Sequence, residues 1–300
     1  MKPISKFIRQ HGWSYLFILP TIATFSIFIL LPVLSSLVMS FGKYTFRDGL
    51  VPITPFYKNY VDAFTTQSGV FVGAIKNTLI YSIFTVTTNI FVGLILASLI
   101  QPLGKRLQNV FRAAYYLPAV TSAVVIGMTW RYIYNGQWGL ANFVLTKLGL
   151  ITEPIRWISD PDIALGSVIL SAMLTVPATA VVLFSAAMGA IPNEYYEAAE
   201  LDGAGPIRKW WNITLPLIKS VTLYLVVLYT IASFEVFERI YTMIPSGVAN
   251  ATETIVTQVY QQGFVQFNYG VAAAQAFVLF VMIASVAVIQ FRSLRSDVQY

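Results

Sequence analysis

The chain has 300 residues, of which 57% are hydrophobic and only 11% charged, and its mean hydropathy is +0.69. Because soluble domains carry roughly 25% charged residues, this composition predicts an integral membrane protein. The net charge of +6 does not indicate nucleic-acid binding, since the basic residues are scattered at the ends of apolar runs; with no cysteine and a single histidine, His11, in the N-terminal tail, neither a disulfide framework nor a metal site is expected.

Six apolar runs are long enough to cross a bilayer, whose core of about 30 Å requires roughly 20 apolar residues in a helix. We predict spans over residues 13–41, about 75–100, 111–134, 163–189, about 221–243 and 270–291. The first run has a basic start, but its apolar part exceeds the 7–15 residues of a signal sequence, so we interpret it as an uncleaved anchor. Pro20 and Pro32 are expected to bend this span, and Pro118 and Pro177 to kink the third and fourth.

The distribution of Lys and Arg predicts the orientation of these spans. One side of the membrane would hold 11 basic residues, in segments 1–12, 101–112, 190–220 and 292–300. The other side would hold 5, in loops 42–74, 135–162 and 244–269. Since cytoplasmic loops carry the excess of positive charge, both termini and the 190–220 loop are predicted to lie in the cytoplasm.

Nothing between the spans resembles a separate soluble domain or a tandem repeat. We therefore predict an all-α membrane protein with one six-helix domain, 13–291, flanked by cytoplasmic tails 1–12 and 292–300. The weakly amphipathic stretch Leu140 to Leu148 is expected along the outer interface. The sequence contains no G-x-x-x-x-G-K-[ST] phosphate loop, so the groups that grip nucleotide phosphates are missing. An energised pump built from this chain needs a separate motor.

The polar loop 190–220 has the pattern of a helix, a turn and a second helix. Pro192 suits a first helical turn, where its missing N–H costs nothing, and two glutamates follow where the helix dipole favours negative charge. Gly203 stands where a left-handed C-terminal cap is expected. Residues 208–215 can form the second helix, and Pro216 is expected to bend it into the fifth span. Such an element is suited to transmitting force to the membrane spans.

Seven residues of this loop have the spacing of a known motif: Glu197, Ala198, Ala199, Gly203, Ile213, Leu215 and Pro216. The pattern resembles the E-A-A loop by which permease subunits of binding-protein-dependent ABC importers dock on their ATPase. The resemblance implies that these residues couple the chain to an ATPase, with the small alanines admitting a close partner surface. The alternative is an ordinary surface helix-turn-helix, since isolated E-A-A triplets are common.

Other segments are similar to the carbohydrate type of these permeases, the maltose and glycerol-phosphate class. They are the run from Phe234 to Tyr241, Lys76 to Thr78, Leu117-Pro118, and Ala249 to Thr254. The chain departs from the family in the last outer loop, where Pro245 to Val248 replaces a Gly-Gly-Pro turn. The departure leaves the docking loop untouched but weakens any substrate inference from the outer loop.

Span five carries the candidates for a substrate pathway: Phe234, Glu235, Phe237, Glu238 and Arg239. An ionisable group at the bilayer centre costs roughly 2.5–3.5 kcal/mol, so these charges need partners or water. Glu235 and Arg239 are four residues apart, on one helical face in the orientation that favours pairing. They could line the path near its outer half, with the two phenylalanines facing a sugar. The alternative is a charge pair that only stabilises helix packing.

Two further groups of polar residues lie in spans. Thr85, Thr87, Thr88 and Asn89, in the middle of span two, could face a channel, although threonines also bond to their own helix, so interhelical packing is the favoured interpretation. Arg131, at the outer end of span three among aromatic residues, is expected to extend to the headgroups.

The resemblance implies a type I ABC importer architecture in a prokaryotic plasma membrane. It implies a second permease, in relatives of this kind usually a different chain, two ATPase subunits that bind ATP and Mg, and an external solute-binding protein. The chain itself would be no enzyme and would hold no cofactor, metal or catalytic residue. It would form half of the pathway for a sugar or related polar solute.

A secondary transporter or channel that needs no ATPase is the alternative. It predicts coupling carboxylates in the middle of several spans and repeated halves. The sequence confines its acidic pair to one span and shows no duplication. A membrane-embedded enzyme is a third class, but one histidine and no cysteine leave little material for it.

Overall fold

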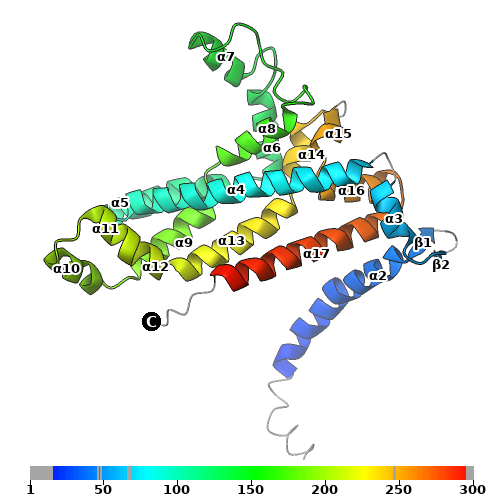
Figure 1. Cartoon of the computed structure of the whole chain (residues 1–300), viewed down its shortest axis with the longest axis horizontal. Coiled ribbons are helices and arrows are strands. Elements are labelled where there is room, and N and C mark those ends of the chain that lie inside the picture. Colours follow the sequence, from blue (N-terminus) through cyan, green and yellow to red (C-terminus); the bar gives the residue numbers. More distant parts are fainter. Residues whose placement is uncertain (1–15, 46, 48, 66–68, 246–247, 295–300) are drawn as a thin grey trace, which may run out of the picture. The chain divides into compact units, whose positions relative to one another are not determined.

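The computed structural model describes residues 16–45, 47, 49–65, 69–245 and 248–294, and most of these are helical (Figure 1). The predicted tail 1–12 with His11, the start of the first span and part of the departing outer turn lie outside the described residues. The chain forms two compact units. One comprises residues 1–65 and 259–277, and the other comprises 66–258 and 278–300.

The first unit begins with one long helix, Leu16–Ser40, which includes the π-helical turn η1 and the segment α2. Its elements are η1 (Ser26–Leu30), α2 (Leu31–Ser40), β1 (Gly42–Thr45), β2 (Gly49–Pro52), α3 (Lys58–Thr65), η6 (Gln261–Val265) and the start of α17 (Tyr269–Leu294). The two strands form an antiparallel hairpin with Gly42 opposite Pro52. Asn59 of α3 donates hydrogen bonds to the carbonyls of Ser40 (3.0 Å) and Gly42 (2.8 Å), so the hairpin and α3 are joined to the end of α2.

The second unit holds most of the helices. They are α4 (Val70–Ile100), α5 (Lys105–Tyr116), η3 (Leu117–Val120), α6 (Ala123–Ile133), α7 (Leu140–Lys147), α8 (Ala164–Met173), α9 (Ala178–Gly189), α10 (Asn193–Leu201), α11 (Pro206–Lys209), η4 (Trp210–Thr214), α12 (Leu215–Leu217), α13 (Lys219–Phe234), α14 (Glu238–Met243), α15 (Ala249–Thr252) and α16 (Ile255–Tyr260). Helices α4, α9 and α13 pack against one another along their length (Figure 1). The amphipathic stretch from Leu140 to Leu148 contains helix α7, and its position along the outer interface stays a prediction.

Four predicted spans correspond to helices long and apolar enough to cross a membrane: Leu16–Ser40, Val70–Ile100, Ala164–Gly189 and Tyr269–Ser293. The third span is not straight, because Lys105–Val120 and Ala123–Ile133 meet at 89°. Pro118 lies in the short 3-10 turn just before this break, so the kink expected there is much sharper than a proline bend in a continuous helix.

The fifth span differs from its prediction, because α13 ends at Phe234 and α14 begins at Glu238. The prediction of one helix to Met243 is therefore wrong, and so is the pairing of Glu235 with Arg239, which lie on opposite sides of the break. A tertiary contact accounts for the break. The Thr254 hydroxyl donates to the carbonyl of Val236 (3.1 Å), which replaces a bond that a continuous helix would supply.

Two apolar clusters form the core of the second unit. One surrounds Tyr81, Val168 and Met243, where α4, α8 and α14 meet. The other surrounds Phe184 and Leu225, where α4, α9 and α13 meet. In this second cluster Gly93 lies against Ala180, and a Cβ on Gly93 would collide with the Ala180 methyl group. Small residues thus allow α4 and α9 to approach closely, as is common between membrane helices.

Candidate coupling loop and membrane cavity

The first helix of the 190–220 loop ends in a glycine cap. Gly203 has φ +76°, in the left-handed region. Its N–H donates to the carbonyl of Glu200 (2.9 Å), and the N–H of Ala204 donates to the carbonyl of Ala199 (2.8 Å). This is the Schellman pattern, in which both bonds use carbonyls that the helix end would leave without partners. The cap predicted at Gly203 is confirmed, whereas Pro192 occupies the N-cap, one position before the first turn.

The second helix runs from Pro206 to Leu217, through α11, η4 and α12, and then bends by 66° into α13. The predicted second helix and the bend after Pro216 are therefore confirmed. Two side-chain contacts join it to α10. Lys209 forms an ion pair with Glu200, and the hydroxyls of Tyr196 and Thr214 are 2.9 Å apart. The helix–turn–helix is consequently a single rigid element, called here the coupling loop (residues 190–220).

The side of the coupling loop that faces the helix bundle anchors the loop to the membrane helices. Ile213 and Leu215, two residues of the predicted motif, pack with Tyr196 against the cluster around Phe184. The indole N–H of Trp210 donates to the hydroxyl of Ser98 on α4 (2.9 Å). In this chain, therefore, Ile213 and Leu215 hold the loop on the bundle rather than facing outward.

The side of the coupling loop that faces away from the helix bundle exposes large apolar side chains. Leu201 is 91% exposed, Ile207 76% and Trp211 62%. Of the motif residues on α10, Glu197 and Ala198 are exposed and Ala199 is partly buried. Leu201, Ile207 and Trp211 were not predicted as contact residues, although large apolar residues in a polar loop indicate a contact surface. An exposed apolar surface rimmed by polar residues is typical of a protein–protein contact.

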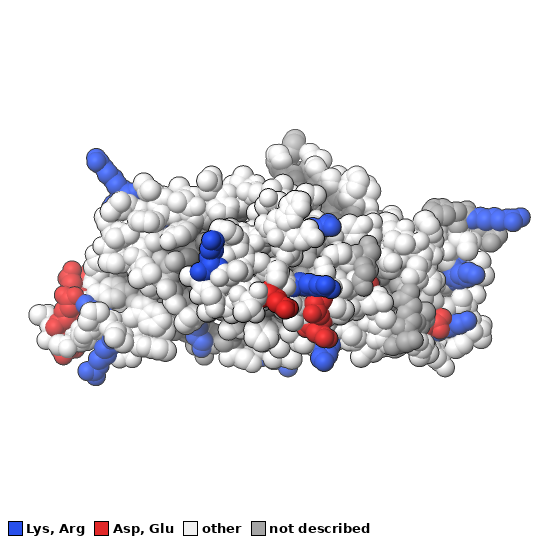
Figure 2. Space-filling view, turned by 90° about the horizontal axis from the view of Figure 1, so that it is seen from above, with Lys and Arg blue, Asp and Glu red and all other residues white. Residues whose placement is uncertain are grey.

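The charge on this surface is mostly acidic. Figure 2 shows Asp and Glu side chains gathered at the end of the second unit that carries α10. They are the exposed residues Glu194, Glu197, Glu200 and Asp202. Arg208 is exposed nearby, and Lys209 is paired with Glu200. The coupling loop thus presents apolar side chains beside a predominantly negative helix.

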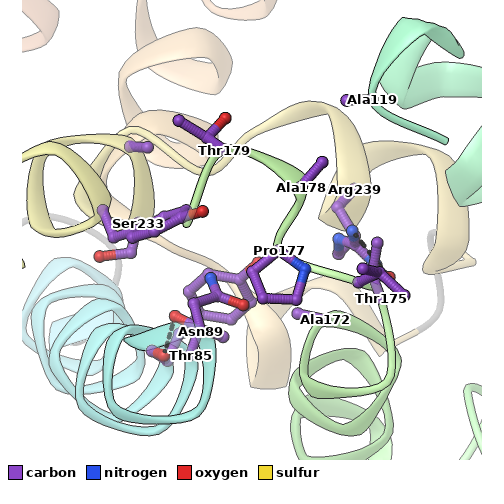
Figure 3. Close-up of a pocket in the computed structure, with 14 residues that line it drawn as sticks. Thr85, Asn89, Ala119, Ala172, Thr175, Pro177, Ala178, Thr179, Ser233 and Arg239 are labelled. Carbon is purple, nitrogen blue, oxygen red and sulfur yellow. Dashed lines mark hydrogen bonds between the residues drawn. The ribbon is translucent and has the colours of Figure 1, made fainter. Parts of the chain in front are cut away.

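A cavity of about 280 Å³ lies between the membrane helices of the second unit (Figure 3). Its lining comes from α4, η3, α8, α9, α13, α14 and the segment between α8 and α9: Tyr81, Thr85, Asn89, Ala119, Ala172, Thr175, Val176, Pro177, Ala178, Thr179, Tyr229, Ala232, Ser233 and Arg239. Three helix breaks, at 121–122, 174–177 and 235–237, border these elements. Interrupted helices in membrane proteins occur where the backbone is enclosed by protein or lines a cavity, and they often form transport sites.

Among the described residues that line the cavity, Arg239 is the one that carries a charge. Its Nη1 donates to the hydroxyl of Ser171 (3.1 Å), and both terminal nitrogens lie 3.5 Å from the hydroxyl of Thr175. Within the described residues the only ion pair is that of Lys209 with Glu200, so no carboxylate neutralises this guanidinium. Figure 3 shows Arg239 beside Thr175 at one end of the cavity, across from Thr85, Asn89 and Ser233.

Of the five pathway residues predicted in span five, Arg239 lines the cavity and the others do not. Phe234 is 2% exposed and lies in the core. Glu235 and Glu238 are exposed outside the lining, and Phe237 stacks on Tyr241 with ring centres 5.1 Å apart. The lining residues Thr175, Tyr229 and Ser233 were not predicted, because only the breaks bring them together.

Two of the four polar residues of span two line the cavity, which was the less favoured of the two roles predicted for them. Thr85 and Asn89 line the cavity, while the hydroxyl of Thr85 also donates to the carbonyl of Tyr81 in its own helix (2.7 Å). Thr87 and Thr88 are not among the lining residues. Arg131 is exposed near the end of α6, which is compatible with its predicted contact with headgroups.

The loop 244–269, which the sequence predicts to be the last outer loop, is bonded to the start of α4. The Asn77 amide donates to the carbonyls of Ala251 (3.0 Å) and Glu253 (2.9 Å), and the N–H of Ile255 donates to the Thr78 hydroxyl (3.1 Å). Two segments singled out by the resemblance, 76–78 and 249–254, are therefore in direct contact. The Glu253 side chain is enclosed there, and burial raises the pKa of its carboxyl from 4.5 to about 7.

A largely helical chain with four to six membrane-crossing elements, interrupted around a polar cavity, is a membrane transport protein in its architecture. The family described as "Binding-protein-dependent transport system inner membrane component" matches residues 89–295 of the chain. The chain belongs to this family and is therefore an inner-membrane permease component of a binding-protein-dependent transport system.

Individual relatives agree with this membership. The arabinooligosaccharides transport system permease protein AraP of Bacillus subtilis (strain 168) is 30% identical over 302 residues, covering 97% of this chain and 94% of that protein. The lactose transport system permease protein LacF of Rhizobium radiobacter is 30% identical over 297 residues, covering 97% and 96%.

Solved structures have the same fold. A chain of a bacterial ABC transporter involved in the import of the acidic polysaccharide alginate superposes with a TM-score of 0.85 at 23% identity, over 99% of this chain and all of the other. A complex of the bacterial alginate ABC transporter with a pentasaccharide-bound periplasmic protein gives a TM-score of 0.82 at 24% identity, over 98% and 99%. At this identity the likeness concerns the fold alone.

Proposed function

We propose that this permease component forms half of the translocation pathway for a sugar or a related polar solute and is driven by a separate ATPase that docks on the coupling loop. The observation that carries the proposal is the position of this loop. It is continuous with α9 and α13, and both helices line the cavity. A displacement of the loop is therefore transmitted directly to the cavity walls.

The mechanical path can be followed residue by residue. Ile213 and Leu215 fix the inner side of the loop to the cluster around Phe184 of α9. Beyond that cluster, α9 begins with Ala178 and Thr179 at the cavity, and α13 contributes Tyr229 and Ser233. Because protein interiors are close-packed, movement of the loop shifts these helices as bodies rather than being absorbed between them. The breaks at 174–177 and 235–237 are the places where such bodies can hinge.

The partners follow from this arrangement and from the family. We expect a second permease, in general a different chain, around a shared pathway, with two ATPase subunits that supply the bound ATP and Mg. An external solute-binding protein would deliver the substrate to the outer loops. Six spans with both termini in the cytoplasm of a prokaryotic cell complete the proposal: they form one domain over 13–291, with tails 1–12 and 292–300, and the chain itself carries no cofactor, metal or catalytic residue.

The relatives support a carbohydrate as substrate. The names of AraP and LacF state transport of arabinooligosaccharides and lactose, and a third relative, UgpA of Agrobacterium fabrum (strain C58 / ATCC 33970), is named for sn-glycerol-3-phosphate. UgpA is 33% identical over 196 residues, which cover 65% of this chain and 66% of UgpA. The cavity of this chain offers hydroxyl and amide groups of the kind that bind sugars, from Thr85, Asn89 and Ser233.

Affinity purification of the tagged chain from native membranes tests the proposal. We expect an ATPase with a phosphate loop and a second permease to be retained. Leu201→Ser should reduce ATPase retention roughly five- to thirtyfold, since removing a buried apolar anchor costs about 1–2 kcal/mol. Leu148→Ser, which changes an exposed leucine outside the coupling loop, is the matched control. Retention of no ATPase under several mild conditions would favour a transporter that works without one.

A further inference from the structure

We infer that the solute carries an anionic group, a carboxylate or a phosphate, which Arg239 binds during passage. The inference rests on the proposed function and narrows its substrate class. A neutral sugar can be held by hydroxyl and amide partners alone. The cavity contains these and, in addition, one full positive charge, which a neutral sugar does not balance.

The charge balance of the cavity is the first argument. A charged side chain among membrane helices is energetically costly and is normally paired. The contacts of Arg239 are the neutral hydroxyls of Ser171 and Thr175. The nearby carboxylates Glu235 and Glu238 do not line the cavity and form no ion pair with it. Within the described residues of this chain, the positive charge inside the cavity therefore has no carboxylate partner.

The geometry of the guanidinium is the second argument. Arginine has five N–H donors in a planar fork, which matches the two oxygens of a carboxylate or phosphate. The contacts at 3.1 and 3.5 Å use only the terminal nitrogens, and the longer ones are weak. Ser171 and Thr175 therefore orient the guanidinium without using all of its N–H donors. Ser171 lies in the last turn of α8 and Thr175 in the break between α8 and α9, so the orientation depends on the local backbone that borders the cavity.

The residues at the opposite end of the cavity indicate which chemical groups the rest of the ligand carries. Thr85 and Asn89 of α4 and Ser233 of α13 are uncharged donors and acceptors (Figure 3). A molecule with an acidic group at one end and hydroxyl groups at the other complements both ends. Acidic sugars and phosphorylated polyols have this chemistry, and a cavity of about 280 Å³ is at the small end for ligand sites, so one such unit would occupy it at a time.

A purely structural role is the competing explanation for Arg239, because its contacts also join α14 to the α8–α9 break. The two explanations differ in what they predict for ligands. If Arg239 only holds α14 against the α8–α9 break, replacing it changes the affinity for charged and neutral ligands equally. An anion site makes affinity depend on the ligand's charge, and it retains part of that preference when lysine replaces arginine.

The test measures calorimetric binding to the purified complex of permease and ATPase in lipid nanodiscs, without nucleotide. The probes form two matched pairs, galacturonate with galactose and glycerol 3-phosphate with glycerol. We expect the wild-type complex to bind one anion at least about tenfold more tightly than its neutral counterpart, because hydrogen bonds to a charged group are stronger than those between neutral groups. The pair that shows the preference distinguishes a carboxylate from a phosphate.

Variants test whether Arg239 causes the preference for the anion. Arg239→Gln should bring the anion-to-neutral ratio close to one, and Arg239→Lys should keep part of it. Arg131→Gln removes the same charge from an exposed position outside the cavity and should leave the ratio unchanged. If Arg239→Gln does not assemble, the wild-type and Arg239→Lys ratios still decide the matter, since their anion preference should fall as ionic strength rises.

The inference is overturned if neither anion binds more tightly than its neutral counterpart, if no probe binds, or if Arg239→Gln keeps the wild-type ratio. In each case retention of the ATPase on the complex would leave the proposed importer function intact. Loss of the ATPase from the wild-type complex would instead contradict the proposed function itself.

Discussion

Gly203 shows how one backbone conformation can decide the shape of a functional loop. With φ at +76° it turns the chain between α10 and the second loop helix, and a Cβ at this position would meet no atom within 4 Å. A substitution would therefore act through backbone strain and not through a collision. For residues other than glycine, the left-handed conformation costs roughly 1–2 kcal/mol, more for β-branched side chains.

We predict that Gly203→Val loosens the glycine cap. Limited proteolysis of the coupling loop should become several-fold faster and ATPase retention should fall, as expected for a strain of about 1–3 kcal/mol. Gly205→Val is the control, because Gly205 has φ −69° and equally open surroundings. Equal proteolysis rates in the two variants would show that the left-handed cap does not determine the loop's order.

Glu253, in the loop 244–269, makes the stability of the folded protein depend on pH. Burial raises the pKa of its carboxyl from 4.5 to about 7, and Oε2 has no hydrogen-bond partner. The folded protein therefore holds a proton that the unfolded chain releases above about pH 4.5. By linkage, this group lowers stability as pH rises from about 4.5 to about 7.

We predict that Glu253→Gln, which mimics the protonated carboxyl, raises the unfolding temperature at pH 8 and leaves it nearly unchanged at pH 5. The gain should be roughly 2–4 °C for each kcal/mol removed. Thermal unfolding of the detergent-solubilised complex across this pH range measures it. Glu238→Gln, at an exposed carboxylate, should follow the wild-type profile. A Glu253→Gln curve parallel to wild type at every pH would contradict the prediction.

At the scale of elements, the packing of α4 on α9 sets the position of the coupling loop. Gly93 faces Ala180 at the crossing, and the same cluster receives Ile213 and Leu215 from the loop. Separation of the two helices would therefore displace the loop anchor as well. The crossing depends on the absence of a side chain at Gly93.

We predict that Gly93→Leu destabilises the assembled protein by about 1–3 kcal/mol, since the added side chain must push the helices apart. The measurement is the unfolding midpoint of the detergent-solubilised protein. Gly73→Leu on the same helix is the control, because a Cβ there meets no atom within 4 Å. A Gly93→Leu midpoint equal to that of Gly73→Leu would mean that the crossing tolerates a larger separation.

At the scale of the whole molecule, the orientation in the membrane can be tested directly. The chain has no cysteine, so a single introduced cysteine reports its own location. We predict that Leu148→Cys reacts with a membrane-impermeant maleimide in intact cells and that Leu107→Cys reacts only after the membrane is opened. Both leucines are exposed, at 67% and 52%, and both lie outside the coupling loop. The reverse pattern would invert the proposed topology.

The sequence by itself determined the membrane class, the family and the outline of the coupling loop. These depend on local properties: runs of apolar residues, the conformational freedom of Gly203, and a motif spacing that needs no knowledge of distant contacts. For the same reason the end of α4 at Ile100 and the bend after Pro216 were predicted closely, since apolar length and a missing backbone N–H act locally. The start of α4 was predicted less well, because the helix begins at Val70 and not at about residue 75.

Only the tertiary structure decided where the chain is interrupted and what faces the cavity. Helical periodicity places Glu235 and Arg239 together, but the bond from Thr254 to the carbonyl of Val236 competes with the helix and separates them. The same competition assembles Arg239, Thr175 and Asn89 from three different elements around one cavity. Contacts between residues far apart in the chain leave no periodic trace in the sequence, so the cavity could not be predicted from it.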